Sequence, residues 1–191
     1  LRIEGLIMAM TLVDSFTTTS EVGSVILGAG SDGSSGNYTI SDNNPHMVVF
    51  SDMTPASDNK LVYVRLTVSG TPQTGSTDYA YAGKQVRAAG THSQIYDSGD
   101  PQLRIGGSTG TGTEESIQGM MMLYNFYNSN GLSSVTYQTA FRAADGNLYG
   151  DHGGGQMQIG GSGGVADGIQ FFFQSSVNIV AGARFNLYKF D

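Results

Sequence analysis

Histidines and carboxylates are the side chains through which this chain could do acid–base or metal chemistry. The three histidines are His46, His92 and His152, and the first two have no Asp or Glu at the spacing of a metal site. His152 follows Asp151 and Asp145, so these three residues could form a cation site. The spacing of a calcium-binding loop is missing, which favours a solvated polar turn instead. We therefore predict no bound metal.

Glu114 and Glu115 are a second candidate, because glycoside hydrolysis uses a pair of carboxyl groups on either side of the scissile bond. Neighbouring residues on a strand point to opposite faces, so these two carboxylates would not converge on one substrate. A solvated loop end is the better interpretation of the pair. A catalytic pair would have to be assembled from separate loops.

Cysteine chemistry and phosphate binding by a glycine-rich loop are two further possibilities, and the sequence argues against both. The chain has no cysteine, which removes disulfides, thiolate metal sites and cysteine nucleophiles. Glycine clusters at residues 106–112 and 160–164 contain fragments of phosphate-binding loops, but no helix is predicted to follow either cluster. We expect a non-enzymatic protein without catalytic residues or a cofactor.

The charge balance restricts the partners that the chain can bind. It has 9 Lys and Arg against 16 Asp and Glu, a net charge of −7 at pH 7. An acidic surface repels nucleic-acid phosphates and anionic lipid headgroups, so we expect neither as a partner. Only 13% of residues are charged, and no apolar stretch approaches the roughly 18 residues of a membrane span. Such surfaces suit proteins that pack against copies of themselves or against a larger assembly.

Short apolar segments separated by turn residues predict an all-β fold. The clearest strand is residues 60–69, in which Val62, Val64, Leu66 and Val68 share one wholly apolar face. Other predicted strands cover residues 46–50, 79–88, 135–141, 156–159, 168–173 and 183–190, whereas residues 106–115 are predicted to form a loop. No segment of ten residues keeps a helical period with caps. Glycine is frequent, with 28 residues, as expected for many tight turns.

The segment of residues 116–127 is apolar on both faces of its predicted strand. Ile117, Met121, Leu123 and Asn125 alternate with a second set. That set is Gln118, Met120, Met122, Tyr124 and Phe126. A sandwich covers only one face of each sheet, so we expect Met120, Met122, Tyr124 and Phe126 to contact another subunit.

The C-terminal 25 residues carry the most distinctive pattern. An aromatic segment, Asp167-Gly168-Ile169-Gln170-Phe171-Phe172-Phe173, is followed by a polar stretch, an Asn178-Ile179 bend with Gly182, and a last strand that ends in Leu187-Tyr188. Ile169, Phe171 and Phe173 share one face, which places Phe172 on the other. We predict that Phe172 meets the opposite layer or a subunit contact, and that the last two strands lie centrally in one sheet.

This pattern resembles the closing hairpin of jelly-roll modules in bacteriophage virion proteins, namely tail fibres and capsid decoration or cement proteins. The resemblance covers about 25 residues well and extends loosely over the last 75 residues. Its motifs are structural rather than catalytic. Residues 17–191 are predicted to form a single antiparallel jelly-roll-like β-sandwich with little or no helix. Residues 1–16 are expected to form an N-terminal docking arm or, alternatively, a local strand.

The resemblance implies a structural component of a bacteriophage particle, located in the virion. We expect a self-associating decoration, cement or fibre protein, a homotrimer that contacts the major capsid protein or another virion protein. The alternative is a receptor- or glycan-binding module of a tail fibre. An enzyme such as a polysaccharide depolymerase has the least support.

Overall fold

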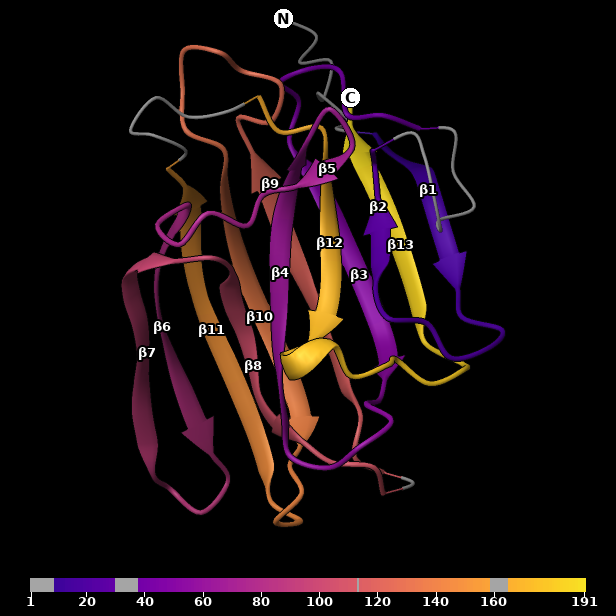
Figure 1. The fold of residues 1–191 in the computed structure, drawn as a ribbon, viewed down its shortest axis with the longest axis vertical. Coiled ribbons are helices and arrows are strands. Elements are labelled where there is room, and N and C mark those ends of the chain that lie inside the picture. The colour runs from indigo at the N-terminus through magenta and orange to yellow at the C-terminus, as the bar shows by residue number, and fades with distance from the viewer. Residues whose placement is uncertain (1–8, 30–37, 113, 159–164) are drawn as a thin grey trace, which may run out of the picture.

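The computed structural model describes residues 9–29, 38–112, 114–158 and 165–191. Strands account for 60% of the chain and helix for 2%, and the strands form two antiparallel sheets (Figure 1). The predicted all-β, jelly-roll-like sandwich is confirmed. The described residues include one short 3₁₀ turn, η2 (Gln174–Ser176).

The larger sheet has eight strands, in the order β1-β13-β3-β9-β10-β11-β6-β7. Every pair of neighbours in it is antiparallel. In spatial order the strands are β1 (Met10–Thr17), β13 (Arg184–Phe190), β3 (His46–Met53), β9 (Ile117–Tyr124), β10 (Ser134–Arg142), β11 (Leu148–Met157), β6 (Tyr79–Arg87) and β7 (His92–Asp100).

The smaller sheet has five strands and lies over the inner face of the larger one (Figure 1). Its central strand β4 pairs with β12 along one edge and with both β5 and β8 along the other. Its strands are β2 (Val25–Leu27), β12 (Gly168–Phe173), β4 (Lys60–Val68), β5 (Thr71–Pro72) and β8 (Leu103–Thr109).

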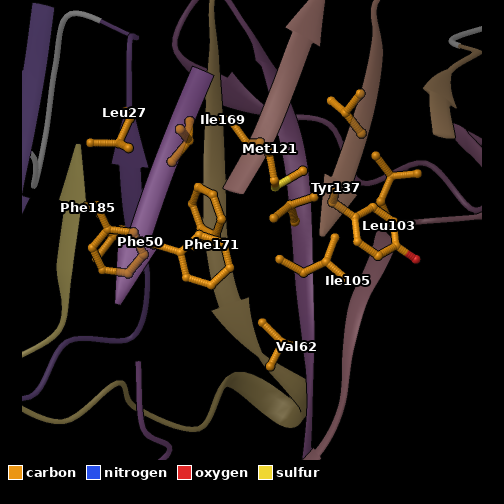
Figure 2. Close-up of a cluster of buried hydrophobic side chains, with 14 of the residues drawn as sticks. Leu27, Phe50, Val62, Leu103, Ile105, Met121, Tyr137, Ile169, Phe171 and Phe185 are labelled. Atoms are coloured by element: carbon orange, nitrogen blue, oxygen red, sulfur yellow. The ribbon is translucent and has the colours of Figure 1, made fainter. Parts of the chain in front are cut away.

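The core fills the space between the two sheets with one contiguous cluster of apolar side chains (Figure 2). Val62, Val64 and Leu66 are fully buried, as their alternation in β4 predicts. Phe50 packs against two other rings, with centroid distances of 5.2 Å to Phe171 and 6.2 Å to Phe185. Burial of such aromatic side chains supplies much of the energy that holds the sheets together.

The last two strands do not lie in the same sheet, so this part of the sequence prediction is wrong. β12 lies between β2 and β4 in the smaller sheet, and β13 lies between β1 and β3 in the larger one. Ser175 and Ser176 adopt positive φ values of 60° and 55°, which bend the chain after β12. The connection therefore crosses from one sheet to the other, and no hairpin forms.

The second half of the predicted N-terminal arm forms a strand, which is the alternative for this segment. Met10–Thr17 is strand β1, which pairs with β13 at the edge of the larger sheet. The carboxylate of Asp14 accepts hydrogen bonds from the amides of Gly28, at 3.0 Å, and Ser15, at 2.8 Å. Burial raises the pKa of Asp14. These contacts make β1 part of the sandwich, while residues 1–8 of the predicted arm lie outside the described residues.

Glycine-rich segments form longer strands than the sequence predicts. The predicted loop at residues 106–115 begins inside β8, which continues to Thr109. The predicted short strand at residues 156–159 is the end of the ten-residue strand β11, and Ile159 lies outside the described residues. Backbone groups pair along a sheet whatever the side chain, so glycine does not prevent a strand where its neighbours supply the partners.

Candidate functional site

The surface that carries most of the predicted contact residues is the outer face of the eight-stranded sheet. Two rows of outward side chains cross its four central strands in register. We call these eight residues the Met120 patch: Met47, Met122, Thr136 and Gly154 in one row, and Val49, Met120, Gln138 and His152 in the other.

Three of the predicted contact residues lie on this face, because β9 keeps the two-residue alternation. Met120 is 41% exposed and Tyr124 is 36% exposed, and Met122 is half-buried between them. Met121, Leu123 and Ile117 point inward and are fully buried. Exposed thioethers on a sheet face form an adaptable apolar surface that another protein can cover.

Phe126 does not belong to this surface, so its assignment as an exposed contact is wrong. Its side chain has no exposed area and belongs to the core. β9 ends at Tyr124, and Asn125 has a φ of 56°, which breaks the alternation before Phe126. The next ring along the chain, that of Tyr127, is 50% exposed.

Phe172 points to the outer face of the smaller sheet, but the chain itself covers it. It is only 7% exposed. Its ring stacks on that of Tyr63 with centroids 5.8 Å apart, and the Arg65 guanidinium lies 4.4 Å above the ring centroid. Side chains of β4 thus cover most of the Phe172 ring and leave it little surface for the predicted subunit contact.

The Met120 patch is not flat. One depression of about 300 Å³ lies on the β11 side of Met120, and another of about 430 Å³ lies on the β3 side. Both are open hollows that are lined in part by Met120 and Gln138.

The patch is almost free of charge. None of its eight residues is a carboxylate or a Lys or Arg, and His152 is its one ionisable member. The charged residue that adjoins it in register is Lys84 of β6, which lies opposite His152. The patch thus contrasts with a chain of net charge −7.

A second candidate site is a polar pocket of about 230 Å³ beside β8. It is lined by Asn59, Gln85, Arg104, Ser108, Phe141, Ala143, Ala144, Asp145 and Tyr149. Tyr149 does not offer a free ring face, because Phe141 stacks on it at 5.4 Å and Arg87 lies 5.7 Å from its centroid. The pocket therefore offers hydrogen-bonding groups rather than an aromatic platform.

Behind Gln85 lies a buried carboxyl group, that of Asp151, which is only 2% exposed. Gln85 Nε2 donates to Asp151 Oδ2 at 3.2 Å, whereas Oδ1 has no hydrogen-bond partner among the described residues. Burial raises the pKa of Asp151 to about 7. The sequence interpretation of this segment as a solvated turn is wrong for Asp151. The segment is strand β11, and its glycines Gly150 and Gly153–Gly155 leave it without the apolar alternation from which a strand is predicted.

The candidate cation site does not assemble. Along β11 Asp151 points inward and His152 outward, while Asp145 pairs with Arg87 at 3.1 Å and accepts a hydrogen bond from the Tyr149 hydroxyl at 3.1 Å. The part of the chain that the structure describes contains no group of three or more His, Asp or Glu that could hold a metal ion.

The remaining candidate residues make structural contacts. The Glu114 carboxylate contacts the Arg142 guanidinium, and Glu115 Oε2 accepts a hydrogen bond from the Gly112 amide at 2.8 Å. His46 is fully buried, with Nε2 2.8 Å from the Tyr38 hydroxyl. Burial lowers the pKa of His46, which favours its neutral form. Among the described residues no helix has the length and apolar character to cross a bilayer.

Comparisons with known proteins leave the family open. No protein-family model matches the chain, and no curated protein matches it. Two solved structures of infectious bursal disease virus, from the Gx and Gt strains, align with TM-scores of 0.11 and 0.10 and identities of 11% and 10%. The alignments cover 96% and 97% of this chain but only 41% and 42% of those chains. Scores this low do not establish a shared fold.

Proposed function

We propose that this chain is a structural subunit of a bacteriophage particle that associates with copies of itself and with other virion proteins. The role is that of a decoration, cement or fibre protein located in the virion, with the major capsid protein as one candidate neighbour. The proposal assigns the chain no catalytic reaction and no cofactor.

One observation carries the self-association part of the proposal: the Met120 patch is an exposed, uncharged, thioether-rich face at the centre of the larger sheet. Met120 is 41% exposed, and apolar side chains continue along its neighbouring row, where Leu12 is 51% exposed and Tyr188 is half-buried. Extended apolar surface on a soluble protein marks a contact with another molecule. The assignment to a virion rests on the sequence pattern of the C-terminal segment alone, because its two strands, β12 and β13, lie in different sheets and do not form the hairpin of the proteins it resembles.

Two measurements test the proposal. Sedimentation velocity at micromolar concentration should show a species heavier than the 20.1 kDa chain. Images of intact particles with a density-labelled chain should place many copies at regular positions on the capsid or fibre. A stable monomer that never copurifies with particles would reject the proposal.

The polar pocket favours a second candidate function, recognition of a glycan or receptor by a fibre tip. Asn59, Gln85, Arg104 and Ser108 line it, and amide, guanidinium and hydroxyl groups are donors that suit sugar hydroxyls. Binding to a glycan array, abolished in Arg104→Ala and retained in Met120→Ala, would establish this function. No binding at millimolar glycan would exclude it.

A further inference from the structure

We propose that Asn130 is a site of spontaneous deamidation in the folded chain, at which the backbone nitrogen of Gly131 attacks the Asn130 side chain and a carboxylate replaces the amide. The reaction needs no enzyme and takes water as its co-reactant. The proposal is independent of the role in a virus particle. It rests on the sequence at this position, on the exposure of the two residues and on the hydrogen bonds around them.

The dipeptide Asn130-Gly131 is the one place in the sequence where glycine follows asparagine. Every other asparagine precedes a residue that carries a side chain. A side chain on the following residue hinders the approach of its backbone nitrogen, whereas glycine has no Cβ and permits a close approach. The sequence therefore favours reaction at Asn130 over all other asparagines.

The reaction proceeds through a five-membered cyclic imide. The Gly131 nitrogen loses its proton to a base in the solvent and forms a bond to Asn130 Cγ. The bond between Cγ and Nδ2 breaks, and Nδ2 takes up a proton and leaves as ammonia. Water then opens the imide at either of its two carbonyl groups. The products are aspartate and isoaspartate, so one ammonia leaves for each water that enters.

The structure places this dipeptide in the connection between β9 and β10, residues 125–133. Asn130 is exposed and Gly131 is partly exposed. The backbone N–H of Asn130 donates to Asn128 Oδ1 at 2.9 Å, whereas the side-chain amide of Asn130 has no hydrogen-bond partner among the described residues. The side-chain carbon is therefore accessible, and its amide is free to rotate toward the next residue.

The backbone N–H of Gly131 is held only weakly. It donates to Asn128 O at 3.5 Å, beyond the 2.7–3.2 Å that is typical of such hydrogen bonds. An N–H group that is held weakly and faces water loses its proton to solvent more readily than one in a strand. Both partners of the first step, the nitrogen and the side-chain carbon, are thus available in the folded chain.

Asp145-Gly146 is an instructive contrast, because an aspartate before glycine can form the same imide. The N–H of Gly146 donates to Ala143 O at 2.8 Å, and the Asp145 carboxylate pairs with Arg87 at 3.1 Å. Both reacting groups of this turn are engaged, so we expect it to react far more slowly than Asn130.

The reaction should change the surface charge of the protein and leave the fold intact. Each event adds one negative charge to a chain of net charge −7. The new carboxylate lies in the connection that also carries Tyr127, which is 50% exposed. That connection is anchored in the core by Phe126, which is fully buried, and neither Asn130 nor Gly131 belongs to the core.

Incubation of the purified chain at pH 6 and pH 8 tests the proposal. Ion-exchange chromatography should show a more acidic form that accumulates faster at pH 8, because the attacking nitrogen must lose its proton. Peptide mapping by mass spectrometry should place a mass gain of about one dalton at Asn130. The chain unfolded in urea gives the reference rate, and the folded chain should react within several-fold of it.

Two variants test the route, and a third is the control. Asn130→Gln should stop the reaction, because its longer side chain would have to close a six-membered ring. Gly131→Ala should slow it several-fold, and it fits the turn because its Cβ would lie 3.1 Å from the movable Asn128 Nδ2. Asn147→Gln, in the turn between β10 and β11, should leave the rate unchanged. Thermal melts of freshly purified variants check that all three are folded.

Four results would overturn the proposal: no acidic form at pH 8, a mass gain spread evenly over several asparagines, reaction in the unfolded chain alone, or an unchanged rate in Gly131→Ala. Reaction in the unfolded chain alone would show that the turn protects Asn130. The particle assignment is tested by other measurements, so a chain that never assembles can still deamidate at Asn130, and a chain that assembles can fail to do so.

Discussion

Phe171 and Phe185 lie in consecutive strands, β12 and β13, yet their rings meet from opposite sheets. The ring centroids are 5.3 Å apart with an interplanar angle of 52°. Both side chains are fully buried (Figure 2). The chain thus closes the sandwich by crossing from one sheet to the other and placing an aromatic side chain at each end of the crossing.

Removing Phe171 should therefore damage the fold itself. Phe171→Ala leaves a cavity between the rings of Phe50 and Phe185 and should lower the free energy of unfolding by about 3–5 kcal/mol. Urea denaturation followed by far-UV circular dichroism measures this loss. Phe190→Ala, at a partly exposed position of β13, is the control and should cost less than about 2 kcal/mol. Equal losses in the two variants would contradict the central role of Phe171.

The sequence predicted those parts of the fold in which side-chain alternation and strand pairing agree. In β4, Val62 and Val64 alternate with larger or polar side chains, and in β13, Phe185 and Leu187 do the same, so their inward direction could be predicted. Alternation is a property of the local backbone, so the inward direction of these side chains can be predicted without knowing the partner strand.

The errors arise where backbone conformation or pairing departs from that rule. A positive φ at Asn125 turns the side chain of Phe126 inward instead of outward. The pattern of apolar residues does not predict this change in backbone conformation. The same local rule cannot tell which sheet a strand joins, so β12 and β13 were expected in one sheet. The pairing partners are set by contacts distant in sequence, such as Phe172 with Tyr63.

The candidate site was predictable in part for the same reason. Alternation in β9 correctly predicted that Met120, Met122 and Tyr124 face outward. It did not predict the buried carboxyl of Asp151, because that residue lies in a glycine-rich segment with no apolar alternation. Its burial depends on Gln85 and Thr139, which the register of β6 and β10 places opposite it.

Phe172 should act within the chain rather than between copies. Phe172→Ala removes the contacts with Tyr63 and Arg65 and should lower the free energy of unfolding by about 1–3 kcal/mol, less than Phe171→Ala, because one side of its site borders solvent. The sedimentation coefficient at micromolar concentration should stay unchanged. A fully folded variant that loses its oligomer would instead show that Phe172 is a subunit contact.

Asp151 should make the stability of the protein depend on pH. Its pKa is about 7 in the folded chain because of burial, against about 3.9 when unfolded, so the folded state binds the proton more tightly between these values. Stability is highest below the unfolded pKa and falls as pH rises from 4 to 7, by at most about 4 kcal/mol. Asp151→Asn should remove this loss and melt at a higher temperature than the natural chain at pH 8.

The matched control for Asp151→Asn is Asp145→Asn, at the turn between β10 and β11. Hydrogen bonds from Asn147 and Tyr149 and the charge of Arg87 lower the pKa of Asp145, so its carboxylate stabilises the fold above its unfolded pKa. Asp145→Asn should therefore lower the melting temperature slightly at pH 8, the opposite direction. If both variants change stability in the same direction, burial does not control the behaviour of Asp151.

The close approach of β11 to β6 should depend on Gly153. A Cβ at this position would lie 2.5 Å from the Ala82 carbonyl oxygen and 2.9 Å from the Tyr137 hydroxyl oxygen. Gly153→Ala must therefore move backbone atoms of the neighbouring strand and should cost about 1–3 kcal/mol of unfolding free energy.

Gly150, in the same strand, has open space, because the nearest atom to its Cβ would be 3.7 Å away. Gly150→Ala should be neutral or stabilise the fold by up to about 1 kcal/mol, because alanine restricts the unfolded chain more than glycine does. Thermal melts of the two variants at the same pH give the comparison. Equal stability of both variants would mean that β6 and β11 do not pair in the register that places Gly153 beside Gly83, and the position of Tyr137 over these glycines would be wrong.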